Sequence, residues 1–307
     1  MRPCLIQGSF VLAGTFLCVG LAARGQELPF STLTDWNHQN TMGWLALRRG
    51  DLQKAEKKFR AAIAIMTPYA KTEVRLLARS YHDLAFTLHE EGRFAAAEPL
   101  AKWALSVREQ YDGASSTALA QNLNLLATIY VSQRRYSEAE PLYRESIPVW
   151  EQSLGAEHIA TATAYEDLAT VLTYQRKYEQ AEPFFKRAQY LFGRGRPNFP
   201  KMVESLSALA ANDVAQGRDA PAADLYKRAI KIYDDKSIPL EDPELATVLD
   251  QYASLLRKTH RDEDAEPLEA RAKAIRERWS TAGPPPPRAP RIPAGAPTQA
   301  PPNSLVR

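Results

Sequence analysis

A short Ala-Glu-Pro motif returns along the chain at a nearly constant interval and constrains the fold more than any other feature. Its full copies begin at Ala97, Ala139, Ala181 and Ala265, and weaker copies begin at Ala55 and Ala222. Each copy is preceded, 12 residues earlier, by another small residue: Gly43, Ala85, Ala127, Ala169, Ala210 or Ala253. Successive copies are 41 to 43 residues apart. A fixed period of this length indicates one structural unit repeated six times.

Each period predicts a pair of amphipathic helices. Around Ala139, the residues Tyr136, Leu142, Tyr143 and Ile147 recur at spacings of three and four, which places them on one helix face. Gly or a basic residue stands between the two helices, as suits a tight turn after a helix C-terminus. Pro fits the first turn of the second helix, because first-turn N–H groups have no intrahelical partner. We expect the second helices to begin near Leu52, Phe94, Tyr136, Tyr178, Asp219 and Asp262.

The two small-residue marks in each period predict how the helices pack. Small side chains allow two helices to approach closely where their ridges and grooves interlock. A bulkier side chain there would overpack the contact, at a cost of about 1–3 kcal/mol. A single period is too short to bury a stable core, so the six pairs must stack on one another.

The arrangement of small and aromatic residues resembles the tetratricopeptide repeat (TPR). Ala139 with Tyr143 and Ala181 with Phe185 carry the small-x3-aromatic spacing of its second helix. The longer period, and the stretch from Leu154 to His158 between two repeats, are similar to the kinesin light chain class of that family. The resemblance implies an all-α chain, folded as a right-handed α-solenoid of six TPR-like helix-turn-helix repeats over residues 37–281. A lead-in at residues 26–36 would precede it.

The fifth predicted pair departs from the family's pattern. Asp213 lies three residues after Ala210, where the family normally has an apolar or aromatic residue. A buried polar residue without a partner is costly. The sequence therefore predicts a looser or kinked first helix in this repeat.

The two ends of the chain have their own compositions. Residues 3–23 form an uncharged, largely apolar run that ends in small residues, so we expect residues 1–25 to be a cleaved signal peptide. An uncleaved membrane anchor is the alternative. The protein is therefore expected to be exported, periplasmic or secreted, and to meet a membrane only if the N-terminus is retained. Residues 282–307 are rich in Pro and Ala and predict a disordered C-terminal tail.

Charge and motifs exclude several classes of function. Of 39 basic residues, five lie outside residues 26–281, which leaves 34 against 36 acidic residues, a net charge of −2. This balance gives no case for a nucleic-acid partner. Both cysteines, Cys4 and Cys18, lie in the expected signal peptide, so the mature chain would have no thiolate ligand. No catalytic, cofactor or metal motif is present, and we expect the protein not to be an enzyme.

The resemblance implies a concave groove lined by the first helices. Transferring that face onto this sequence gives thirteen candidate partner-binding residues: Asn37, Asn40, Trp44, Arg79, His82, Phe86, His89, Gln121, Asn124, Thr128, Glu166, Thr170 and Asp250. Kinesin light chains would have an Asn ladder here, and only Asn40 and Asn124 could belong to one. The groove is instead graded, with aromatic and basic residues in its N-terminal half and acidic residues in its C-terminal half.

The sequence thus favours a non-catalytic scaffold for protein–protein interaction. We expect an extended peptide or partner segment in the groove, with its hydrophobic or acidic end near Trp44 and Phe86. These two side chains could alternatively be covered by Pro29, Phe30 and neighbouring helices. A second alternative for the whole protein is a structural, envelope-assembly component that contacts its partners by the convex face and is tethered by an uncleaved N-terminus.

Overall fold

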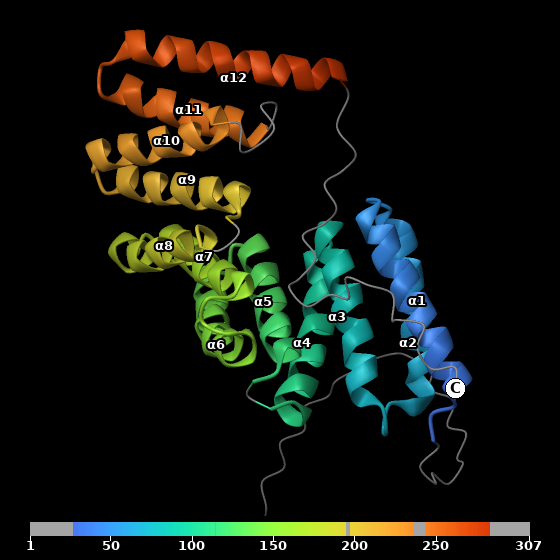
Figure 1. Cartoon of the computed structure of the whole chain (residues 1–307). Helices are drawn as coiled ribbons and strands as arrows, with labels where there is room; N and C mark the ends of the chain where they lie inside the picture. Colours follow the sequence, from blue (N-terminus) through green and yellow to red (C-terminus); the bar gives the residue numbers. More distant parts are fainter. Residues whose placement is uncertain (1–26, 114, 195–196, 236–242, 283–307) are drawn as a thin grey trace, which may run out of the picture.

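The computed structural model describes residues 27–113, 115–194, 197–235 and 243–282, and this part of the chain is built from twelve α-helices without any strand (Figure 1). A single 3₁₀ turn, Thr67–Tyr69, follows the second helix. The helices are α1 (Phe30–Arg48), α2 (Leu52–Met66), α3 (Val74–Glu90), α4 (Phe94–Tyr111), α5 (Thr117–Ser132), α6 (Tyr136–Leu154), α7 (Ile159–Tyr174), α8 (Tyr178–Phe192), α9 (Phe199–Ala215), α10 (Asp219–Asp234), α11 (Pro243–Lys258) and α12 (Asp262–Ala282). The expected all-α solenoid of six helix pairs is confirmed, and all six second helices begin at the expected residues.

The turn inside each pair has the same geometry. Its central residue has a positive φ, and this residue is Gly50, Gly92, Arg134, Arg176, Gly217 or His260. In the second pair the backbone N–H of Arg93 donates to the carbonyl of Leu88 over 2.8 Å, which closes a Schellman motif. The same bond is formed in the other five turns. In half of the pairs the residue with positive φ is not a glycine, which costs conformational energy. The hydrogen bonds to the last free carbonyls of the helix offset this cost.

Both rows of small residues lie inside the solenoid. The eleven alanines of the two rows have at most 1% of their surface exposed, and Gly43 is buried as well. At Gly43 the ring of Phe59 from α2 fills the space of the missing side chain. A Cβ on residue 43 would stand only 2.6 Å from Phe59 Cε1. The small residues thus set the distance between the paired helices, as the sequence predicts.

The first helices of the pairs lie on the inner side of the curved stack. Close backbone approaches between alternate helices join α3 to α5, α7 to α9 and α9 to α11. Successive second helices have no comparable approach among the described residues. Figure 1 shows the helix direction turning gradually from α1 to α12. We call the side formed by α1, α3, α5, α7, α9 and α11 the inner face.

A second regular feature joins neighbouring repeats on the side of the second helices. The Glu of the repeated motif accepts from a basic residue four positions later in its own helix and from the basic residue that precedes the next second helix. The four glutamates with these two partners are Glu56 with Arg60 and Arg93, Glu98 with Lys102 and Arg135, Glu140 with Arg144 and Lys177, and Glu182 with Lys186 and Arg218. We call this series the glutamate ladder. It ends at the fifth repeat, where Ala223 replaces the Glu.

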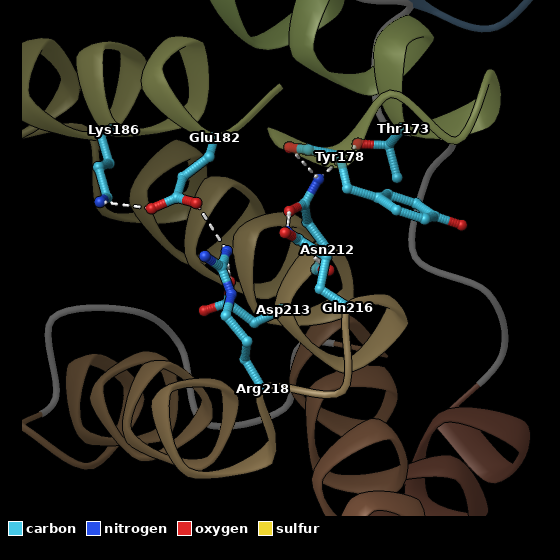
Figure 2. Close-up of polar contacts among 8 residues, drawn as sticks. All are labelled: Thr173, Tyr178, Glu182, Lys186, Asn212, Asp213, Gln216 and Arg218. Carbon is cyan, nitrogen blue, oxygen red and sulfur yellow. Dashed lines mark hydrogen bonds and ion pairs between the residues drawn. The ribbon is translucent and has the colours of Figure 1, made fainter. Parts of the chain in front are cut away.

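Arg218, the basic partner of the last glutamate of the ladder, explains how the fifth repeat accommodates the buried Asp213 (Figure 2). Asp213 is only 5% exposed, yet α9 continues through it without interruption. Arg218 donates to Asp213 and, over 2.7 Å, to Glu182 of the preceding repeat. The expectation of a looser or kinked first helix is therefore wrong, because the carboxylate has a charged partner five residues later.

The lead-in also differs from the expectation. Helix α1 begins at Phe30, directly after Pro29, so most of residues 26–36 forms the first turns of the solenoid. Leu28 and Leu33 pack against Trp36, which is buried with Met66 and Leu77. The expected signal peptide and the C-terminal tail, apart from Ala282, lie outside the described residues. Within the described residues, no helix has both the length and the apolar character needed to span a bilayer.

The Gly43 contact gives a test of the small-residue rule. Gly43→Ala adds helix propensity worth up to about 1 kcal/mol, but its Cβ would collide with a fully buried ring. We expect a net loss of about 1–3 kcal/mol in the free energy of unfolding, measured by urea denaturation followed by circular dichroism. Gly113→Ala is the control, because a Cβ there meets nothing within 4 Å. Equal stability of the two variants would contradict the packing argument.

The ladder gives a second test through pH. Hydrogen bonds from Lys186 and Arg218 lower the pKa of the Glu182 carboxyl. A lowered pKa stabilises the fold above the carboxyl's unfolded pKa, and this stabilisation is lost as the pH falls through the folded value. Glu182→Gln should cost at most about 1 kcal/mol near neutral pH, the upper end for partly exposed pairs. The difference in the free energy of unfolding between Glu182→Gln and the wild type should disappear at acidic pH. Glu179→Gln, at an exposed position of the same helix, is the control, and its free energy of unfolding should stay close to that of the wild type.

Candidate functional site

The predicted partner-binding residues all lie on first helices, and the structure divides them by exposure. Asn37 is exposed, and Arg79, His89, Gln121, Asn124, Thr128, Thr170 and Asp250 are half-buried. The other five, Asn40, Trp44, His82, Phe86 and Glu166, are buried. The inner face thus has its larger side chains buried in the first two repeats and partly exposed polar residues in the third and fourth.

Trp44 and Phe86 belong to the core. Each is 7% exposed, and their ring centroids lie 5.9 Å apart. The ring of Phe59 meets Trp44 edge-on at 6.0 Å, and the indole N–H of Trp44 donates to Asp83 Oδ2 over 3.3 Å. Phe30 is 84% exposed, so neighbouring helices bury the two aromatic residues and Phe30 does not. Little aromatic surface remains for a hydrophobic ligand in this part of the inner face.

Two ionisable residues are buried beside these aromatic rings. Burial lowers the pKa of His82 to about 4, so its imidazole is neutral at physiological pH. Burial raises the pKa of Asp83 to about 7, against the opposing effects of Arg79 and the Trp44 hydrogen bond. These shifts come from packing within the first two repeats. Among the described residues, no cluster of three or more His, Cys, Asp or Glu could hold a metal ion.

The middle of the inner face is polar and more open. The hydroxyl of Thr128 donates to the carbonyl of Asn124 over 2.8 Å, and its Oγ1 lies 2.9 Å from Tyr143 Oη, within hydrogen-bond distance. Glu166 is 4% exposed, and its Oε2 accepts from Lys201 Nζ over 2.8 Å. The same ammonium group donates to Glu204 Oε2 over 2.9 Å. Burial raises the pKa of Glu166 to about 7 despite this lysine.

One register of the inner face has buried polar atoms that lack partners. It lies three residues before each first-helix small residue. In four successive repeats it provides a side-chain atom without a hydrogen-bond partner among the described residues: His82 Nδ1, Asn124 Oδ1, Glu166 Oε1 and Ser207 Oγ. A buried polar atom without a partner costs about 1–3 kcal/mol. Four of them at one register set this row apart from the glutamate ladder, whose carboxylates are paired.

His89, Asp250 and Asn40 have local partners. His89 Nε2 lies 2.9 Å from Ser132 Oγ, and its ring packs on Phe94. Asp250 forms an ion pair with Arg276 of α12. Asn40 donates to the carbonyl of Trp36 over 2.9 Å. These contacts hold side chains near the N-terminal and C-terminal ends of the row within the protein itself.

Sequence reasoning missed Lys201 and the glutamate ladder. Lys201 stands 35 residues after Glu166, and no helix pattern points to that pairing. The ladder did leave a signal. A basic residue follows each of the four ladder glutamates by 36 or 37 residues, which is the distance to the turn of the next repeat.

The comparisons agree with this architecture. Residues 37–110 and 116–189 match the family model of the tetratricopeptide repeat. The crystal structure of BtubC (BKLC) from P. vanneervenii superimposes with a TM-score of 0.64 at 22% identity, over 76% of this chain and 94% of that one. A structure described as a kinesin light chain with nearly identical TPR-like repeats from Podospora anserina superimposes with a TM-score of 0.59 at 18% sequence identity. The superposition covers 67% of this chain and 96% of that one.

A more distant similarity involves a protein with a bound ligand. The Rap protein complexed with Competence and Sporulation Factor gives a TM-score of 0.57 at 15% identity, over 85% of this chain and 79% of that one. At these identities the solved structures show a shared fold. No curated protein matches the chain. Residues 37–110 and 116–189 thus contain tetratricopeptide repeats, and the helix pairs after residue 189 continue the same fold, which is typical of protein-interaction scaffolds.

Proposed function

We propose that the protein is a non-catalytic scaffold that binds an extended segment of a partner protein along its inner face. The observation that carries the proposal is the register of buried polar atoms without partners on α3, α5, α7 and α9. An extended peptide offers N–H and C=O groups at regular intervals, which is the chemistry these side chains lack. Asn124 and Ser207 are half-buried, so each of these two residues keeps some exposed surface that a peptide can contact.

The proposal places the bound segment over repeats three to five. In the first two repeats Trp44 and Phe86 fill the inner layer, and their burial leaves little room for a ligand. At the equivalent positions the later repeats have Thr128, Thr170 and the exposed Ala211. Smaller side chains allow a backbone to approach the helices closely. The Rap protein complex, which shares the fold, provides a precedent for a TPR-like solenoid with a bound factor.

A crosslinking experiment tests the inner face against the outer one. A photoreactive amino acid at Ala211, exposed on α9, should crosslink to a partner in an extract of the native extracytoplasmic fraction. The same group at Lys227, exposed on α10 of the same repeat, should not. Mass spectrometry of the crosslinked peptide then identifies the bound segment. Crosslinks from Lys227 alone would favour binding by the convex face and would contradict the proposal.

Ala211→Arg gives the corresponding functional test. It places a long charged side chain on the inner face at an exposed position, so we expect it to weaken partner binding at least tenfold with little change in melting temperature. Lys227→Ala is the control on the outer side. Phe86→Ala would not serve, because truncating a buried aromatic residue costs about 3–5 kcal/mol and would unfold the repeat.

We also propose that the protein acts outside the cytoplasm. The support is the N-terminal sequence, in which an uncharged apolar run ends in small residues. N-terminal sequencing of the protein isolated from its native cells should find a mature chain that begins near residue 24 or 26. A chain that retains Met1 would instead support the tethered alternative.

A further inference from the structure

We propose that the open end of the solenoid, formed by α1 and α2, binds the surface of a lipid bilayer that contains anionic phospholipids. This inference goes beyond the peptide proposed for the inner face, because it concerns the first repeat and another side of the molecule. It rests on four cations of that repeat, which we call the basic cluster: Arg48, Arg49, Lys54 and Lys57.

The basic cluster is exposed and has no partner within the described chain. All four side chains are exposed, and none of them forms a hydrogen bond or an ion pair with the described residues. Residues 48–60 contain six basic residues and two acidic ones, a net charge of +4, whereas residues 26–281 as a whole have a net charge of −2. The first repeat therefore concentrates positive charge that the rest of the chain does not.

The acidic residues around the cluster have other contacts or lie far from it. Asp51 caps α2 by accepting from the backbone N–H of Lys54 over 3.0 Å. Glu56 accepts from Arg60 over 2.7 Å and from the second repeat over 2.8 Å. Asp35 precedes Arg48 by 13 residues, which is about 20 Å along the axis of α1. With Asp51 and Glu56 counted, the stretch still has its net positive charge.

Helix geometry places the lysines on the side of α2 that faces away from the second repeat. Lys54 and Lys58 lie two residues before and after Glu56, which is about 200° around the helix in either direction. Glu56 pairs with the second repeat, so these lysines are on the opposite side. Lys58 Nζ donates to Gln39 Oε1 of α1 over 3.1 Å, which shows that this side of α2 adjoins α1. Lys57, three residues after Lys54, neighbours it on the helix surface.

Helix α1 has an exposed row of residues at the same end of the solenoid. Figure 1 shows α1 at one end of the stack, and no other described helix lies beyond it. Its exposed residues recur at intervals of three and four, which places them on one face: Phe30, Thr34, His38, Thr41, Leu45 and Arg48. None of them is acidic, and Phe30 and Leu45 are exposed apolar side chains. We call this row and the basic cluster together the end face.

A bilayer surface fits the composition of the end face. Phe30 and Leu45 are 15 residues apart, about 22 Å along α1, so a partner that meets both must be broad and flat. The same partner must accept cations and apolar side chains together. Anionic headgroups attract Lys and Arg, and the boundary between headgroups and acyl chains accepts Phe and Leu. A soluble polyanion would bind the cations alone.

The position of the first repeat in the sequence supports the same partner. Residues 24–29 join the apolar run of residues 3–23 to α1, and six residues span at most about 20 Å. If the run is retained in a bilayer, this short connection holds the end face near the headgroups. If the run is cleaved, the end face binds the bilayer on its own and reversibly.

A vesicle-binding experiment tests the inference. The protein isolated from its native cells is mixed with vesicles of phosphatidylcholine, or of equal parts of phosphatidylcholine and phosphatidylglycerol, and bound protein is measured by flotation. We expect tighter binding to the anionic vesicles, and salt should weaken it. The double variant Lys54→Gln, Lys57→Gln should bind them at least about tenfold more weakly. Lys227→Gln with Lys231→Gln removes the same charge from exposed positions of α10 and is the control.

Lipid crosslinking tests the contact directly and can be used whether or not the apolar run is retained. A photoreactive amino acid in place of Leu45 should crosslink to lipid in the anionic vesicles. The yield should fall when Lys54→Gln and Lys57→Gln are added. The same amino acid in place of Lys227, in the fifth repeat, should not crosslink to lipid. Circular dichroism checks that each variant is folded.

The outcomes are distinguishable. Lipid crosslinks at residue 45 that depend on phosphatidylglycerol and on the two lysines would support the inference. Absence of these crosslinks, with equal binding of the wild type and the lysine variant to vesicles, would overturn it. Crosslinks at residue 45 to a second copy of this chain or to an acidic protein, in place of lipid, would overturn it as well. None of these results affects the peptide proposed for the inner face.

Discussion

Close packing at the two rows of small residues is the constraint on which the rest of this structure depends. These residues are almost fully buried, and at Gly43 even a methyl group has no room beside Phe59. Because each repeat contacts little beyond its neighbours, the same short helix-to-helix distance is reproduced along the chain. The first helices consequently approach one another on the inner side at α3 and α5, at α7 and α9, and at α9 and α11. The inner face is therefore a product of small side chains that lie beneath it.

The two regular rows of polar residues differ in how they are satisfied. In the glutamate ladder each carboxylate has two basic partners, one in its own helix and one in the next repeat. On the inner face, the register of His82, Asn124, Glu166 and Ser207 retains atoms without partners. The first row stabilises the stack and does not need a ligand. In the second row Glu166 also pairs with Lys201, but one polar atom in each of four repeats has no partner among the described residues. This contrast is the physical reason for proposing that the inner face binds a partner.

Much of the fold was predictable from the sequence, because its determinants are local and repeat. The period placed all six second helices, since each begins after a turn whose Gly or basic residue can be recognised. The consequences of single polar residues were less predictable. Asp213 was expected to disturb its helix, and the structure pairs it with Arg218 across the turn. That partner is close in sequence, but only the positive-φ turn at Gly217 brings the two side chains together.

The exposure of the inner-face residues could not be predicted from register alone, because it depends on how volume is shared between the two helices of a pair. One residue after the small residue of the first helix stand Trp44, Phe86, Thr128, Thr170, Ala211 and Ser254. Four residues after that of the second helix stand Phe59, Ala101, Tyr143, Phe185, Tyr226 and Glu269. In the second repeat the first helix has the large residue, Phe86, and the second helix has the small one, Ala101. In repeats three to five the first helix has the small residue and the second helix has the aromatic one.

This exchange determines which parts of the inner face are open. The hydroxyls of Thr128 and Tyr143 lie 2.9 Å apart, so the two positions share one space in the third repeat. Because protein interiors are close-packed, one large side chain must fill that space, and it can come from either helix of the pair. The first repeat fills it from both helices, and this is possible only because Gly43 leaves room for Phe59 beneath Trp44. Where the second helix provides the aromatic ring, the first helix can present small polar groups to a ligand, and those repeats contain Asn124, Glu166 and Ser207.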